Sequence, residues 1–242
     1  RIIAAATGLH FAAVPLDAEF DIDVSAALEA IERHCLAVVY LDYPNNPRGK
    51  LFDDRKVRAV IEAAPGLVVL DEAYHPYAGA TLAGALEDYD HVVVLRTLSK
   101  LGLAGLRLGV LMGPPAWVEQ FEKTRLPYNV NVLTQASAVF ALARREVLEE
   151  QVRLIRADRA RLYERLCALP GVIVYPSYAN FILFRVAAGD AARVFEGVKA
   201  RGVLIRRFAD EQGPLAGCLR VTVGTAQEND AFITALAASL PR

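Results

Sequence analysis

The chain has 242 residues, of which 54% are hydrophobic, so it is long enough to bury a core in one large or two small domains. Its 27 lysine and arginine residues balance 28 aspartate and glutamate residues, and no basic run favours a nucleic acid or an acidic membrane as partner. No apolar run reaches the roughly 18 residues that span a bilayer, and no signal pattern opens the chain, so we expect a soluble cytoplasmic protein that acts on small molecules.

The first half of the chain alternates helix and strand patterns. An apolar helix at 2–7 and a strand at 9–16 precede an amphipathic helix for which Ser25 is the expected N-cap. Short runs rich in valine and leucine then follow at 36–41, 67–70 and 92–95, with a helix at 53–64 between the first two. Such runs are typical of strands buried on both faces, so this order predicts a parallel α/β sheet. A strand at 108–112 and a helix at 117–124 follow.

The second half has a different pattern. Two helices are predicted at 132–143 and 146–169, the second ending at Pro170-Gly171. Short strands are then predicted at 172–175, 181–186, 203–206 and 219–223, with helices at 191–200 and 227–239. We therefore expect residues 1–145 to form a large domain, and residues 146–242 to form a long connecting helix and a small α+β domain.

Cysteine and histidine spacing gives no metal-ligand pattern. Cys35, Cys167 and Cys218 are odd in number and far apart, which fits a reducing compartment, and we expect them to be buried packing residues. The four histidines do not cluster either, so no metal site is predicted.

Polar side chains follow each of the three buried runs. Asn46 follows the first, Asp71 and Tyr74 follow the second, and Lys100 follows the third. Taken alone, each has an ordinary structural explanation: a turn asparagine, a helix-capping aspartate or a solvated lysine. Because the carboxyl ends of parallel strands meet at one edge of a sheet, the three together predict a single site there.

The stretch from Arg96 to Arg107 contains the groups that one particular cofactor needs. Lys100 offers an amine that forms a Schiff base with an aldehyde, whereas Thr97, Ser99 and Arg107 suit a phosphate dianion. This combination favours pyridoxal phosphate.

Four motifs in this order resemble the fold-type-I pyridoxal-phosphate aminotransferases of the aspartate aminotransferase superfamily, and within it they are most similar to the histidinol-phosphate aminotransferases. The motifs are Tyr43-Pro44-Asn45-Asn46-Pro47-Arg48-Gly49, Asp71-Glu72-Ala73-Tyr74, Thr97-Leu98-Ser99-Lys100 through Gly105-Leu106-Arg107, and Cys218-Leu219-Arg220-Val221-Thr222-Val223-Gly224-Thr225. The resemblance implies a mainly parallel sheet flanked by helices, followed by a smaller α+β domain.

The resemblance also implies a role for each matching residue. The catalytic residues would be Lys100, which holds the cofactor, Asp71, which pairs with the pyridine nitrogen, and Tyr74. Asn46 and Tyr74 would hold the phenolic oxygen of the ring. Thr97, Ser99 and Arg107 would bind the phosphate, and Arg220 would grip an anionic group of the substrate. Arg206 would face the substrate phosphate, although a strand-end surface charge is an equal alternative.

The implied reaction moves an amino group between glutamate and imidazole-acetol phosphate in histidine biosynthesis, in a homodimer. Threonine-phosphate decarboxylases are similar and also bind a phosphorylated substrate, so they remain an alternative, as does an inactive remnant. Two departures from the family pattern stand out. Arg48 replaces the usual threonine, and the chain begins about where a long preceding segment of the family would end. We therefore expect a truncated chain.

Overall fold

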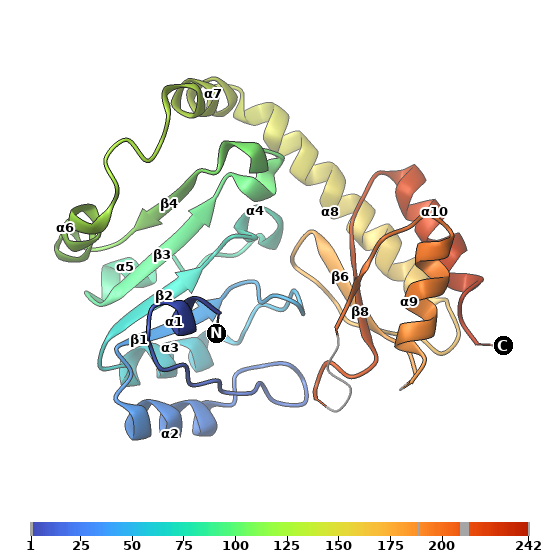
Figure 1. The fold of residues 1–242 in the computed structure, drawn as a ribbon, viewed down its shortest axis with the longest axis horizontal. Coiled ribbons are helices and arrows are strands. Elements are labelled where there is room, and N and C mark those ends of the chain that lie inside the picture. The colour runs from blue at the N-terminus through green and yellow to red at the C-terminus, as the bar shows by residue number, and fades with distance from the viewer. Residues whose placement is uncertain (1, 188, 209–212, 242) are drawn as a thin grey trace.

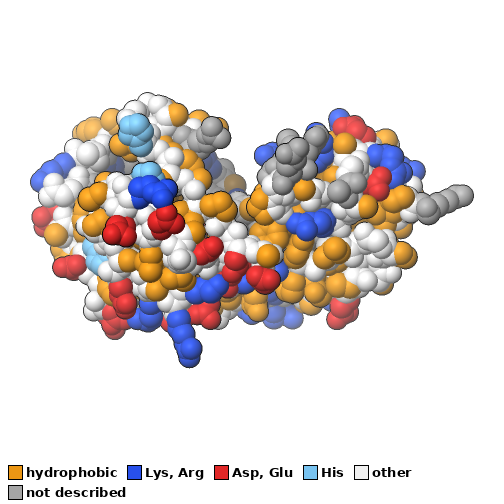
Figure 2. Space-filling view, turned by 90° about the horizontal axis from the view of Figure 1, so that it is seen from below, with side chains coloured by type: hydrophobic (Ala, Val, Ile, Leu, Met, Phe, Trp, Pro, Cys, Tyr) orange, Lys and Arg blue, Asp and Glu red, His pale blue; other side chains and the backbone are white. Residues whose placement is uncertain are grey.

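Two sheets, each with its own helices, are joined by the long helix α8 (Arg145–Cys167). The computed structural model describes residues 2–187, 189–208 and 213–241. Figure 1 shows α8 running from the part that holds the first sheet to the part that holds the second. Viewed from below, the surface is hollowed between these two parts (Figure 2).

The first sheet has the strand order β1-β2-β3-β4. Its strands are β1 (Val38–Asp42), β2 (Leu67–Asp71), β3 (Val92–Thr97) and β4 (Gly109–Met112). β1, β2 and β3 are parallel, and β4 is antiparallel to β3. The predicted mainly parallel sheet is therefore confirmed, and the ends of β1, β2 and β3 lie at the same edge.

Both faces of this sheet are covered by helices, as uninterrupted apolar strands require. The helices of this part are α1 (Ile2–Ala6), α2 (Val24–His34), α3 (Asp54–Ala63), α4 (His75–Ala78), α5 (Ala85–Asp88), α6 (Pro115–Thr124) and α7 (Val132–Leu142), with the 3₁₀ turns η1 (Ser99–Leu101) and η2 (Ala104–Leu106). On one face Val68, Leu70, Val92 and Val94 pack with side chains of α2 and α3. On the other, Leu67, Val69 and Val93 pack with Trp117 and Phe121 of α6.

The second sheet is antiparallel and has the order β5-β6-β8-β7. Its elements are β5 (Ile173–Val174), β6 (Phe181–Arg185), α9 (Ala191–Ala200), β7 (Arg206–Arg207), β8 (Cys218–Thr222) and α10 (Ala226–Ala237). Its core joins Ile182, Phe184 and Leu219 to Leu162 of α8 and Phe232 of α10. Thr225 and Glu228 form a capping box at the start of α10.

Several expectations about the chain are wrong, and the strand expected at 203–206 covers only Arg206–Arg207. Residues 9–16 form no strand, because Pro15 has no N–H to donate and this segment pairs with no neighbour in either sheet. The N-cap of α2 is Asp23, whose side chain accepts from the Ala26 N–H at 3.0 Å, in place of Ser25. Cys35 and Cys167 are exposed because each lies at a helix end, whereas Cys218 is buried in β8.

No helix within the described ranges is both long and apolar enough to cross a membrane.

Candidate active site

Asp71 lies at the carboxyl end of β2 and is held through both of its carboxylate oxygens. Its Oδ1 accepts from the Ala73 N–H at 2.9 Å, and its Oδ2 accepts from the hydroxyl of Tyr40 on β1. Asp42 is the register partner of Asp71 across the two parallel strands. Burial, and then the Asp71 charge, raises the pKa of Asp42 to about 6, although a hydrogen bond from the Asn46 backbone opposes the shift.

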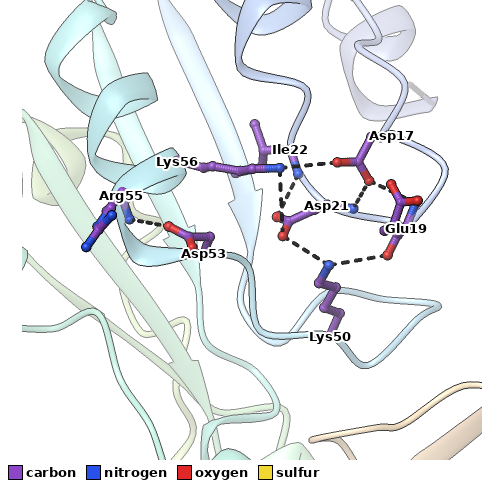
Figure 3. Close-up of polar contacts among 8 residues, drawn as sticks. All are labelled: Asp17, Glu19, Asp21, Ile22, Lys50, Asp53, Arg55 and Lys56. Atoms are coloured by element: carbon purple, nitrogen blue, oxygen red, sulfur yellow. Dashed lines mark hydrogen bonds and ion pairs between the residues drawn. The ribbon is translucent and has the colours of Figure 1, made fainter.

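Asn46 lies in the loop 43–50 after β1, and several contacts fix this loop. At its end Lys50 forms an ion pair with Asp21 at 3.0 Å and donates to the Glu19 carbonyl at 3.3 Å. Figure 3 shows how Lys50 and Lys56 converge on the acidic side chains of the segment 17–21. These contacts fasten the end of the loop to the segment 17–21, which belongs to the part of the molecule that holds the first sheet.

The same loop also contacts the part that holds the second sheet. Gly49 accepts at its carbonyl from the Tyr178 N–H at 2.7 Å, and the Arg48 guanidinium donates to the Pro176 carbonyl. Arg48 is only 8% exposed and lies 4.8 Å from the centroid of the Tyr175 ring. The residue that departs from the family pattern is therefore a buried contact between the two parts.

A chain of contacts links the side chains that follow β1, β2 and β3 to β8. Lys100 Nζ lies 5.3 Å from the centroid of the Tyr74 ring, and this ring meets Phe181 edge to face at 5.1 Å. Arg220 of β8 stacks 4.6 Å from the Phe181 ring centroid and donates to Asn46 Oδ1. Asn46, Tyr74, Lys100 and Arg220, far apart in sequence, thus lie in one place.

The backbone of η1, the turn that carries Lys100, is held by hydrogen bonds with residues outside the turn. The buried hydroxyl of Tyr77 donates to the Lys100 carbonyl. The Thr97 hydroxyl donates to the Leu108 carbonyl at 3.2 Å and accepts from the Ser99 N–H at 3.0 Å, so it positions the start of η1. Arg107 follows η2 in the left-handed region, with φ of 52°, and its exposed guanidinium donates to the Ala104 carbonyl at 3.4 Å.

Beneath the site, Glu72 is fully buried and fully partnered. Its carboxylate accepts from Arg96 at 2.8 and 3.0 Å, from the Thr81 hydroxyl at 2.8 Å and from the Leu82 N–H at 2.6 Å. Burial, and then the charge of Arg96, lowers the pKa of His75 next to the motif. In the sequence, Asp71 and Tyr74 therefore lie on either side of a buried glutamate, Glu72, whose position is fixed by an ion pair and hydrogen bonds.

The two arginines proposed for substrate lie on adjacent strands. Arg206 of β7 is the register partner of Arg220 of β8. Both line a hollow with Thr222, Phe195 and Leu204. Burial, and more weakly the Arg206 charge, lowers the pKa of Arg220. Two guanidinium groups opposite each other repel, so this place favours an anion.

The sequence reasoning missed Tyr40 and Tyr77, which contact Asp71 and Lys100 directly, and Asp42, which is the register partner of Asp71. A signal for Tyr40 and Asp42 was available. Residues 40 and 42 alternate onto one face of β1, and in a parallel register this face is shared with Asp71 of β2. No comparable signal exists for Tyr77, whose contact with Lys100 depends on how α4 folds back toward η1.

Comparison with known proteins gives a consistent result. Histidinol-phosphate aminotransferase 2 of Nitrosococcus oceani is 55% identical over 238 residues, which are 98% of this chain and 66% of that protein. The chain thus spans slightly under two thirds of the length of this relative. The histidinol-phosphate aminotransferase of Clostridium acetobutylicum has the same fold, with a TM-score of 0.90, 23% identity, and coverage of 98% of this chain and 73% of that one.

A third relative was solved with a ligand. The histidinol-phosphate aminotransferase of Sinorhizobium meliloti, in complex with pyridoxal-5′-phosphate, is 28% identical, with a TM-score of 0.87 and coverage of 98% of this chain and 66% of that one. These likenesses confirm the predicted fold-type-I architecture. The family model "Aminotransferase class I and II" matches residues 1–236, so the chain belongs to that family.

Proposed function

We propose that this chain carries the active site of a pyridoxal-phosphate-dependent aminotransferase that moves an amino group between glutamate or 2-oxoglutarate and L-histidinol phosphate or imidazole-acetol phosphate. The observation that carries the proposal is the contact chain from Lys100 through Tyr74 and Phe181 to Arg220 and Asn46. The relatives with more than 48% identity that bear the histidinol-phosphate aminotransferase name support the substrate.

The residues present fit the cofactor chemically. A carboxylate, Asp71, is held through both oxygens and suits a protonated pyridine nitrogen. The Asn46 amide and the Tyr74 phenol suit the phenolic oxygen of the ring, and Lys100 provides the amine for covalent attachment. Ser99 and Arg107 would supply a hydroxyl and a guanidinium for the phosphate, and Thr97 would donate to it in place of its present bond to the Leu108 carbonyl. When bound, pyridoxal phosphate would supply an aldehyde that condenses with amines and a ring that accepts electrons from the substrate Cα.

The reaction then depends on this chain's side chains. Lys100, once released by the substrate amine, would take the proton from the substrate Cα and deliver it to the carbon that was the aldehyde carbon of the cofactor. Its backbone is held by Tyr77, so the amine is presented from a fixed turn. Arg220 binds an anionic group of the substrate, and Arg206 beside it binds the substrate phosphate.

We also propose the boundaries and assembly expected for such an enzyme: a large domain at 1–145, a connecting helix and small domain at 146–242, a homodimer, and a cytoplasmic location. Two separate cores support the division. The homodimer is supported by α7, an apolar helix that buries only Thr134 and Ala138. Its other side chains include Val132, Leu133, Val139 and Phe140, each at least 60% exposed.

The test is an assay of the protein that contains this chain. It is incubated with L-histidinol phosphate, 2-oxoglutarate and pyridoxal phosphate, and glutamate is measured. We expect glutamate from the wild type and none from Lys100→Ala. Carbon dioxide from threonine phosphate without glutamate would identify a decarboxylase instead, and neither product would refute both reactions.

A further inference from the structure

Two side chains of β1 surround Asp71, and neither belongs to the proposed set of cofactor contacts. Tyr40 and Asp42 lie two residues apart on one strand, so both project from the same face of the sheet. Asp42 is directly across from Asp71 in the parallel register, and the Tyr40 hydroxyl donates to Asp71 Oδ2. The three form a cluster at the carboxyl ends of two neighbouring strands.

The cluster is electrostatically unfavourable unless a cation joins it. Two carboxylates on adjacent strands repel when both are ionised, and Asp42 is partly buried, so water screens the repulsion poorly. Burial first and the Asp71 charge second raise the pKa of Asp42, as this repulsion requires. Burial, the hydrogen bond to Asp71 and the charges of Asp71 and Asp42 also raise the pKa of Tyr40, which keeps its phenol protonated as a donor.

The charged and polar groups that face this cluster come from β1, β2 and the residues that follow each of these strands. Asp42 meets the Asp71 charge from β2 and the Asn46 N–H from the loop 43–50. Tyr40 meets the charges of Asp71 and Asp42. Asp71 is held by the Ala73 N–H on one oxygen and by Tyr40 on the other, so its direction is fixed. A protonated aromatic nitrogen placed against Asp71 would be stabilised by two negative charges.

We propose that Asp42 and Tyr40 are positioning residues that act through Asp71: Asp42 adds a second negative charge that retains the proton on the cofactor's ring nitrogen, and Tyr40 fixes the direction of the Asp71 carboxylate. The inference rests on the proposed function, since it assigns these residues to the ring-nitrogen side of the same site. The capacity of the protonated cofactor ring to accept electrons then depends on side chains of both β1 and β2.

The test uses pyridoxine 5′-phosphate, which lacks the aldehyde and so reports ring protonation without a bond to Lys100. It is bound to the whole chain, and the ring-nitrogen pKa is read from ultraviolet absorbance as pH is varied. Asp42→Asn should lower this pKa by about one pH unit. Asp42→Glu, which keeps the charge, should hold it near the wild-type value. Asp90→Asn is the matched control because Asp90 is fully exposed and precedes β3 at the opposite end of the sheet, so it should cause no change.

Tyr40→Phe tests the second role. Loss of one hydrogen bond to a carboxylate should weaken binding of the analogue roughly fivefold or more, measured by fluorescence titration. Tyr128→Phe, at a side chain that is 97% exposed, should leave it unchanged.

The outcomes separate the two proposals. A ring-nitrogen pKa that is equal in the wild type and Asp42→Asn would overturn the inference and leave the proposed function standing. A ring pKa that Asp42→Glu fails to hold would also overturn it, because a structural role alone would then explain the loss. Failure of the wild-type protein that contains this chain to bind the analogue would overturn the proposed function and this inference with it.

Discussion

At the scale of single residues, the site depends on charges that are placed where water screens them poorly. Glu72 has no exposed side-chain surface, and Arg96 is its charged partner. Asp42 has the opposite arrangement, because its nearest charge is another carboxylate. The two cases predict opposite effects when a charge is removed.

Arg96→Met should destabilise the fold by roughly 3 kcal/mol, because it leaves the Glu72 carboxylate buried with only the Thr81 hydroxyl and the Leu82 N–H. The free energy of unfolding in urea measures this. Arg125→Met is the matched control, since its pair with Glu122 is exposed on both sides and its loss should cost no more than about 1 kcal/mol. Equal costs for the two variants would contradict the anchoring role of Glu72.

Asp42→Asn should stabilise the fold at neutral pH. The pKa of Asp42 in the folded chain is about 6, above the ordinary value of 3.8, so the stability that comes from its protonated form is fully present below about pH 4 and is lost as pH rises through 6. The variant does not titrate. Its advantage over the wild type should be absent near pH 4 and reach on the order of 2 kcal/mol at pH 8. Urea unfolding at several pH values checks this, and a pH-independent difference would show that Asp42 titrates normally.

At the scale of elements, the loop 43–50 joins the two parts of the molecule. Gly49 has φ of +73°, and a Cβ built there would lie 2.1 Å from Ser177 Oγ. This glycine is required both by its backbone conformation and by close approach.

Gly49→Ala should therefore cost about 2 to 4 kcal/mol of unfolding free energy, from backbone strain together with the clash. In the background of Ser177→Gly the contacts with Oγ and Cβ are gone and only a milder one with the Cα of residue 177, at 3.3 Å, remains beside the strain, so the same substitution should cost less, about 1 to 2 kcal/mol. Denaturant unfolding of the wild type, the two single variants and the double variant gives the coupling energy between residues 49 and 177. Identical costs in both backgrounds would mean that the two loops do not touch.

At the level of helices and strands, the sequence predicts the structure well only where a local residue pattern decides it. The sequence places the ends of β1, β2 and β3 within two residues of where the structure has them, because runs rich in valine and leucine stop at polar residues. The burial of Arg48 could not be predicted, since its partner Pro176 lies 128 residues later and nothing in the turn motif indicates it. The false strand at 9–16 has the same origin: apolar side chains such as Val14 and Leu16 pack on the core from an irregular segment.

At the scale of the whole molecule, the exposed apolar side chains of α7 and of the segment before it form an unusual surface. Leu126, Leu133 and Val139 are each at least 70% exposed. A helix that is apolar on most of its surface is ordinarily buried. We therefore expect two copies of the chain to associate through this surface.

Val139→Glu should weaken self-association at least tenfold, because a charge would be transferred into an apolar contact. Sedimentation velocity over a range of concentrations measures it. Ile173→Glu is the matched control, at a side chain that is 58% exposed on β5, and it should leave association unchanged. A wild-type chain that remains monomeric at all concentrations would refute the proposed interface.

The central claim is that residues from three strand ends and from β8 form one site for an aldehyde cofactor attached to Lys100. The most direct measurement is to incubate the chain with pyridoxal phosphate, reduce with borohydride and locate the phosphopyridoxyl group by peptide mass spectrometry. Lys50, Lys56, Lys123 and Lys199 serve as internal controls. We predict modification of Lys100 and of none of the others, and loss of that label in Lys100→Ala. Label spread over the other lysines with Lys100 unmodified would contradict the account.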